Sequence, residues 1–165
     1  KDVTTDTSAY FTSPTAATTT GVVAAVNGVV TLNGAKVATI TGLTINIAGG
    51  MSAVPVVGSN SYSDIAEGRV RVTGQLTALF EDLTYFDLFD DETEFAIAAA
   101  FTTASTAAAD FVSFVLPRVK LGSADIDDGE KNLSQTLSFT ALYNSAGGAG
   151  TSSEQSTLVI QDSQA

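Results

Sequence analysis

Two clusters of carboxylates are the residues in this chain best placed to do chemistry. Seven acids and no base lie between Glu81 and Glu94, and four more acids lie between Asp125 and Glu130. Closely spaced carboxylates can hold Ca²⁺, or can serve as the acid and base of glycoside hydrolysis. A run of like charge is more often a solvated face, so each cluster needs further features before it indicates a site.

The second cluster, Asp125-Ile126-Asp127-Asp128-Gly129-Glu130, does not match a calcium loop. An EF-hand loop has acids at its positions 1, 3 and 5, Gly at 6 and Glu at 12. Counting from Asp125, Gly129 stands at the fifth position and Thr136 at the twelfth. The sequence therefore predicts a solvated turn between strands here, and no metal site.

Catalytic chemistry has little support elsewhere in the chain. A glycosidase cleft is usually lined by aromatic rings that stack on sugars, but the chain has no Trp and four Tyr. It also has no Cys and no His, which excludes thiol nucleophiles, imidazole bases, disulfides and thiolate metal sites. The stretch Gly147-Gly148-Ala149-Gly150 lacks the Lys-Ser/Thr that follows a phosphate-binding loop. We predict no catalytic residue, no cofactor and no metal, so an enzyme is the weakest functional class.

The charge balance excludes further functions. Across 165 residues, 7 bases face 18 acids, which gives a net charge of −11. Clustered Lys and Arg hold nucleic-acid phosphates and anionic membranes, so both are disfavoured as binding partners. No apolar run approaches the roughly 20 residues of a membrane helix. Arg118 and Lys120 fall on one face of a strand, and we expect them to meet an acidic patch on a neighbouring subunit.

Short apolar runs between turn residues indicate β-strands through the first part of the chain. Residues 1–20 are rich in Thr, Ser and Ala, which predicts a flexible or docked N-terminal arm. Asn27-Gly28, between two Val-rich runs, predicts a hairpin, and Asn33-Gly34 predicts a second turn. Lys36 to Ile47 then alternates in the manner of a half-buried strand.

The segment from Ala48 to Gly68 is a long predicted loop with an apolar stretch at Val54 to Val57, for which we expect an exposed contact. The clearest strand runs from Arg69 to Phe80, with one apolar face and one polar, uncharged face. Gly74 in its middle predicts a bend or bulge.

After this strand the spacing of apolar residues changes. Leu83, Phe86 and Phe89 recur at every third position, after the acids Glu81 and Asp82. This pattern predicts one short amphipathic helix, anchored by those three residues, with an acidic exposed side.

Strands are predicted again over Phe95–Phe101, Phe111–Leu116, Leu133–Tyr143 and Thr157–Ile160, with Pro117 ending the second of them. About eight or nine antiparallel strands and one helix favour a mainly β fold, an antiparallel β-sandwich or barrel with one short flanking α-helix. The predicted organisation is the arm at 1–20 and a single β-sandwich domain at 21–165.

Several motifs, in their order along the chain, resemble the tail tube (major tail) proteins of long-tailed bacteriophages. The motifs are Asn33-Gly34 before a Thr/Ile strand, Val54-Pro55-Val56-Val57-Gly58-Ser59, Gly68-Arg69-Val70-Arg71-Val72-Thr73-Gly74-Gln75-Leu76-Thr77-Ala78-Leu79-Phe80-Glu81-Asp82, Leu116-Pro117-Arg118-Val119-Lys120 and Gln135-Thr136-Leu137-Ser138-Phe139-Thr140-Ala141-Leu142-Tyr143. The passage from strand through Phe-Glu-Asp to helix and the Pro-Arg-Val-Lys strand are the most specific. The chain looks like the C-terminal part of longer members that carry two tube domains in tandem.

The resemblance implies a structural virion protein that forms rings, and rings that stack into a hollow tube for DNA ejection. It implies as partners other copies of the chain, the tape-measure protein and tail terminator or tip proteins, with DNA only in transit and no membrane. It also implies a phage tail assembled in the host cytoplasm. Under this reading the expected lumen-facing residues are Thr73, Gln75, Thr77, Ser138 and Thr140. The expected inter-ring contacts are Val54, Pro55, Val56, Val57 and Ile65.

A different class of protein fits the composition as well. Cell-surface, pilus-like or S-layer β-sandwich modules are also Thr/Ala-rich, low in charge and free of Cys. In such assemblies too, oligomerisation would protect the exposed edges of the sheets. The residues alone leave open the host, a trimeric or hexameric ring, the completeness of the chain and a contractile or non-contractile tail.

Overall fold

The computed structural model describes residues 23–55, 57–58, 64–106, 108–127, 132–147 and 155–163. Its contacts define two compact units, one of Lys1–Gly21 with Ala48–Arg71 and one of Val22–Ile47 with Val72–Ala165. The span predicted as one domain, 21–165, therefore contributes to both units. The predicted arm at 1–20 lies outside the described residues.

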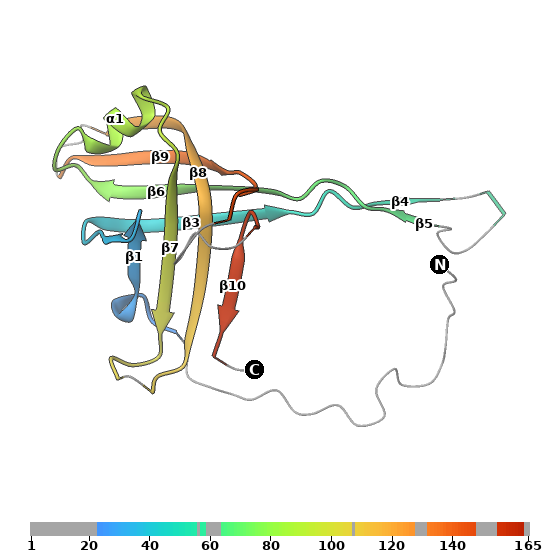
Figure 1. The fold of residues 1–165 in the computed structure, drawn as a ribbon, viewed down its shortest axis with the longest axis horizontal. Coiled ribbons are helices and arrows are strands. Elements are labelled where there is room, and N and C mark those ends of the chain that lie inside the picture. Colours follow the sequence, from blue (N-terminus) through green and yellow to red (C-terminus); the bar gives the residue numbers. More distant parts are fainter. Residues whose placement is uncertain are drawn as a thin grey trace. The chain divides into compact units, whose positions relative to one another are not determined.

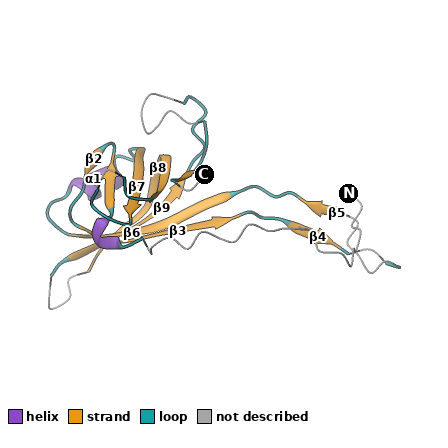
Figure 2. Cartoon of the chain, turned by 90° about the horizontal axis from the view of Figure 1, so that it is seen from below, coloured by secondary structure: helices purple, strands orange, loops and turns teal. Residues whose placement is uncertain are grey.

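Antiparallel strands build the larger unit, with one short helix (Figures 1 and 2). The elements are a 3-10 turn η1 (Ala25–Asn27), β1 (Val29–Leu32), β2 (Ala35–Lys36), β3 (Ile40–Ala48), β6 (Arg71–Leu79), α1 (Thr84–Asp90), β7 (Phe95–Thr102), β8 (Phe111–Asp127), β9 (Ser134–Ala141) and β10 (Val159–Asp162). The strand order is β2-β1-β7-β8-β9-β6-β3, and β10 pairs with β8. This arrangement confirms the predicted mainly β, antiparallel fold with one short helix.

Strand β8 joins two layers of strands. Through Val119 it pairs with β7, and from Val119 onward it pairs with β9. In Figure 1, β3, β6 and β9 run across the direction of β1, β7 and β10, so β8 takes part in both layers. The predicted strand end at Pro117 is wrong, because β8 is a single strand of 17 residues that runs through Pro117 to Asp127. In the ladder with β7, Leu116 and Val119 are successive paired residues, so Pro117 lies within a shift of the register. The N–H that proline lacks is therefore not needed for a ladder hydrogen bond.

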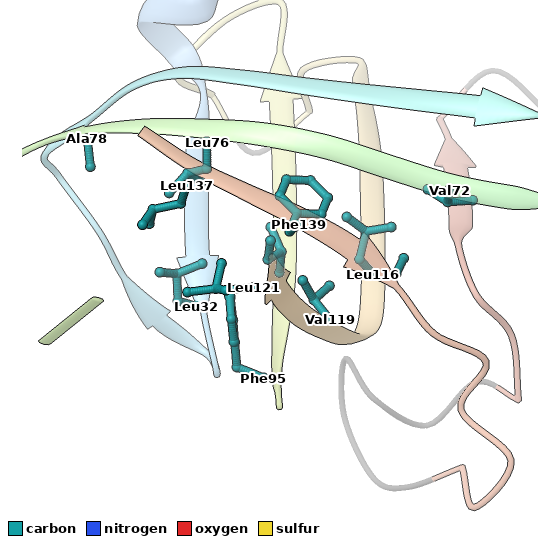
Figure 3. Packing of buried hydrophobic residues seen from close by; sticks show 12 residues of the cluster. Leu32, Val72, Leu76, Ala78, Phe95, Leu116, Val119, Leu121, Leu137 and Phe139 are labelled. Carbon is teal, nitrogen blue, oxygen red and sulfur yellow. The ribbon is translucent and has the colours of Figure 1, made fainter. Parts of the chain in front are cut away.

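The hydrophobic core lies between these layers (Figure 3). Alternate residues of each strand supply it, including Leu76 from β6, Leu137 and Phe139 from β9, and Leu116 from β8, each at most 2% exposed. Full burial of a large aliphatic side chain stabilises the fold by roughly 1.5–3 kcal/mol. The same face of β9 also buries the Gln135 amide, for which the described residues provide no hydrogen-bond partner.

Of the two predicted Asn-Gly turns, only the second forms a hairpin. Asn33 and Gly34 have φ angles of 49° and 81°, and they connect β1 to β2 as a two-residue turn. The hairpin predicted at Asn27-Gly28 is wrong, because Asn27 ends the η1 turn and Gly28 is extended. Gly28 instead lies against the ring of Phe101, where a Cβ would come within 2.8 Å of Cδ1.

The described part of the smaller unit contains a short hairpin rather than an irregular loop. Strand β4 (Ser52–Val54) pairs antiparallel with β5 (Asp64–Ala66), with Ala53 opposite Ile65. Backbones also approach closely at the base of the hairpin, where a Cβ on Gly68 would overlap the carbonyl of Gly50. An isolated two-stranded ribbon is only marginally stable in water, so this hairpin depends on further contacts.

Gly74 serves close packing and does not interrupt the register of its strand. The register of β6 with β9 runs without a shift from Val72 to Leu79, so the predicted bulge is wrong. A Cβ at Gly74 would overlap both the Thr44 carbonyl oxygen on β3 and the ring of Phe139. Glycine is thus required where backbone and aromatic ring approach each other.

The close packing at Gly74 predicts how a methyl group added there changes the stability of the fold. Gly74→Ala should lower the free energy of unfolding by about 1–3 kcal/mol, because β3 or Phe139 has to move. Gly42→Ala is the matched control, since its Cβ would meet only Thr77 side-chain atoms at 3.7 Å or more. Urea unfolding followed by circular dichroism measures both. Equal stability of the Gly74 variant and the wild type would contradict this account of the glycine.

Candidate functional site

The five residues expected on a common polar face do lie on one face of the sheet. Thr73, Gln75 and Thr77 alternate along β6 with buried Val72, Leu76 and Ala78. On β9, Thr140 pairs with Thr73 and Ser138 pairs with Gln75. The ladder therefore brings these side chains together on the side opposite the core.

Strands β3 and β8 extend this polar face. Ser123 on β8 pairs with Ser138, and their hydroxyl oxygens are 2.8 Å apart. On β3, Thr44 and Asn46 line a shallow depression of about 430 Å³ together with residues of β6, β8 and β9. Sequence reasoning did not include these three residues, although Thr44 and Asn46 alternate with apolar Leu43 and Ile45. We call the whole set the hydroxyl face: Thr44, Asn46, Thr73, Gln75, Thr77, Ser123, Thr136, Ser138 and Thr140.

Fixed positive charge is scarce beside the hydroxyl face. Lys120 pairs with Thr140 across the β8–β9 ladder, but its ammonium lies 2.5 Å from a carboxylate oxygen of Glu92. Asp125 pairs with Thr136 and adds a carboxylate at the other end of the ladder. Arg71 stands two residues before Thr73 on β6 and is exposed, so among the described residues the face keeps a cation at one end. The other side chains of the face can exchange hydrogen bonds but carry no positive charge to hold phosphates.

Arg118 and Lys120 are engaged within the chain, which corrects the expectation that they meet a neighbouring subunit. The Arg118 guanidinium donates from Nε to Glu94 Oε2 at 2.6 Å and from Nη2 to Oε1 at 2.7 Å. Its Nη1 donates to the Tyr143 carbonyl. These hydrogen bonds lower the pKa of the Glu94 carboxyl, and the hydrogen bond from Lys120 lowers the pKa of Glu92. Together the two pairs fasten the segment after α1 to β8.

Helix α1 packs through a different set of side chains than the sequence suggested. Tyr85, Leu88 and Phe89 pack against the core. Leu83 is 55% exposed and Phe86 is 40% exposed, so of the expected anchors Leu83, Phe86 and Phe89 only Phe89 is packed. A spacing of three residues falls short of the 3.6-residue turn, so residues at that spacing move progressively around the helix. The i, i+3, i+4 set matches the buried side.

The expected contact residues of the hairpin region are exposed where they are described. Val54, Pro55, Val57 and Ile65 all have exposed side chains, and Val57 is fully exposed. Val56 lies outside the described residues. Exposure does not identify a partner for these side chains, so the contact stays a prediction.

The acidic turn expected after Leu121 is in part a strand. Asp125 and Asp127 belong to β8, and 128–131 lie outside the described residues. Within the described ranges no group of three acids could hold a metal ion. No helix in this part of the chain has the length and apolar character needed to cross a membrane.

A family model described as phage tail tube protein matches residues 1–141. The chain belongs to the phage tail tube protein family. It is therefore a structural component of a phage tail, and the alternative of a cell-surface module is not favoured. No curated protein matches the chain in sequence.

Solved structures share the fold of this tail tube protein at low sequence identity. One is the sheath/tube terminator, in the extended state, of the extracellular contractile injection system PVC, with a TM-score of 0.66 and 9% identity over 87% of this chain and 99% of that one. Another is the SPP1 tail tube, with a TM-score of 0.55 and 10% identity over 72% of this chain and 74% of that one. At such identities the likeness concerns the fold alone.

The charge-assisted pair of the tail tube protein predicts how its stability depends on pH. The native pKa of Glu94 lies below its usual 4.5, so the pair stabilises the fold above that value and the contribution is lost as pH falls through the native pKa. Glu94→Gln should therefore make stability less dependent on pH between neutral and acid solution, while Glu94→Asp keeps a carboxylate. Urea midpoints at a series of pH values measure this. An unchanged pH profile in the Gln variant would contradict it.

Proposed function

We propose that this tail tube protein polymerises as stacked rings into the hollow phage tail tube and that the tube conducts DNA during ejection. The observation that carries the proposal is the hydroxyl face, a broad polar surface of the β8–β9–β6–β3 sheet. Among the described residues, its Lys120 is paired with Glu92, and an exposed cation remains only at Arg71, the first residue of β6. A chain with a net charge of −11 repels phosphates, and such a wall would let DNA slide.

Ring formation is supported by the edge of the sheet. Strand β3 has nine residues and ends the strand order, and among the described residues no strand pairs with its outer side. An exposed edge of this length is a template for pairing with another chain. Joining the sheets of neighbouring copies would satisfy these backbone groups and close the hydroxyl faces into one inner wall.

The lumen assignment follows from this arrangement. Thr73, Gln75, Thr77, Ser138 and Thr140 lie on the hydroxyl face and would line the lumen. In this proposal the inter-ring contacts are Val54, Pro55, Val56, Val57 and Ile65, because apolar side chains on a marginal hairpin need cover. The N-terminal arm at 1–20 would add contacts to the tube-type domain at 21–165.

The remaining parts of the proposal concern partners and place. Before ejection the lumen would hold the tape-measure protein, and terminator or tip proteins would bind the ends of the tube. The terminator-like fold of the PVC structure is consistent with tube ends and tube walls being built from one fold. Assembly would take place in the host cytoplasm, and the role requires no catalysis.

Electron microscopy tests the proposal directly. Purified protein at rising concentration, with salt to screen its charge, should form hollow tubes with a regular axial repeat. Flat sheets would contradict the proposed tube, as would persistent monomers from the full-length gene product.

Chemical labelling tests which face lines the lumen. The chain has no Cys, so a single introduced thiol can be labelled alone. In assembled tubes, Gln75→Cys should react with a small maleimide and resist a bulky polymer maleimide. Val29→Cys, an exposed position on β1 in the other layer, should react with both. The reverse pattern would place the hydroxyl face on the outside.

A further inference from the structure

The outward side of α1 is an apolar surface bordered by acids. Leu83, Phe86, Asp87 and Asp90 recur at i, i+3, i+4 and i+7, so they share one face of the helix and its N-terminal flank. Leu83 and Phe86 remain 55% and 40% exposed while Tyr85, Leu88 and Phe89 pack inward on the other side. We call these four residues the α1 outer face. Exposed apolar side chains rimmed by charge are typical of a surface that another protein covers.

Few cations in the described chain are available to meet such a surface. Arg118 and Lys120 are bound to Glu94 and Glu92. The other cations among the described residues are Lys36, Arg69 and Arg71, and all three are exposed. Two of them flank Val70, whose side chain is 56% exposed.

Arg69-Val70-Arg71 therefore has the chemistry that complements the α1 outer face. An apolar side chain stands between two guanidinium groups, and guanidinium groups pair readily with carboxylates. In chain order this basic segment ends at Arg71, the first residue of β6, and the acidic helix follows β6. Each copy thus carries both the basic segment and the α1 outer face. A contact between two such unlike surfaces is heterologous, and it can continue from copy to copy.

We propose that Arg69-Val70-Arg71 of one copy docks on the α1 outer face of a copy in the adjacent ring. Val70 covers Leu83 and Phe86, and the two arginines pair with Asp87 and Asp90. This contact rests on the proposed function, since it gives ring stacking a specific acceptor surface. It also explains how strongly acidic chains associate, because each contact brings a basic segment against an acidic one.

Cysteine pairing tests the contact between separate copies. Val70→Cys protein mixed with Phe86→Cys protein under oxidising conditions in tubes should give a disulfide-linked pair, since a disulfide requires Cα atoms within about 7 Å. Each variant alone should give much less, and Val70→Cys mixed with Val26→Cys is the exposed-site control. Equal yields from the Phe86 and Val26 mixtures would overturn the docking.

Charge reversal supplies an independent test. Arg71→Glu should leave the melting temperature and the rings intact and lower the sedimentable tube fraction by roughly tenfold or more, because like charges then face each other. Asp87→Arg in the same chain should restore tubes. Lys36→Glu makes an equal charge change elsewhere and should stack normally, as should Glu67→Gln beside the arginines.

The outcomes separate this contact from the proposed function. Tubes that persist in Arg71→Glu, or that Asp87→Arg does not restore, would overturn the docking and leave the tube assignment intact. Loss of the rings themselves would overturn the assignment of the contact to stacking. Wild-type protein that forms no tubes would overturn the proposed function and the docking with it.

Discussion

The change of partner along β8 is the constraint on which the rest of the structure depends. One continuous strand pairs with β7 in its first part and with β9 in its second, so two layers of strands share a single backbone. The core forms between the layers, and the opposite side of the β9 layer becomes the hydroxyl face. Pro117 is tolerated at the point of change because no ladder partner is required there. The polar surface thus owes its position to the same strand that closes the core.

The positions of the charged side chains follow from this arrangement of strands. The two bases in the middle of β8 form ion pairs with the segment after α1, so among the described residues the hydroxyl face keeps an exposed cation only at Arg71, the first residue of β6. The acids collect around α1, and the exposed arginines flank Val70, with Arg71 as the first residue of β6. In the proposed tube, such an acidic chain would associate through apolar side chains and a few placed cations, and its inner wall would attract phosphates little. These properties would suit the proposed role of a conduit for DNA.

The family match and the structure answer different questions about this chain. The match to phage tail tube proteins shows that the chain is a structural tail component. The proposed tube would use three features of the described structure, which are the outer edge of β3, the hydroxyl face and the β4–β5 hairpin. Gly74 illustrates how closely these are linked, since the packing of Phe139 beneath the hydroxyl face requires the absence of a side chain there.

The sequence by itself determined the strand alternation, the Asn33-Gly34 turn and the single short helix, because these depend on local backbone preference and on a period of two. The five residues expected on one polar face were found together for the same reason. The strand, charged group or ring that a given residue contacts was decided only by the tertiary structure. The continuation of β8 through Pro117, the capture of Arg118 by Glu94 and the packing of Gly28 against Phe101 all involve residues distant in sequence. The buried side of α1 also depended on where the core lies, so Leu83 and Phe86 were left exposed.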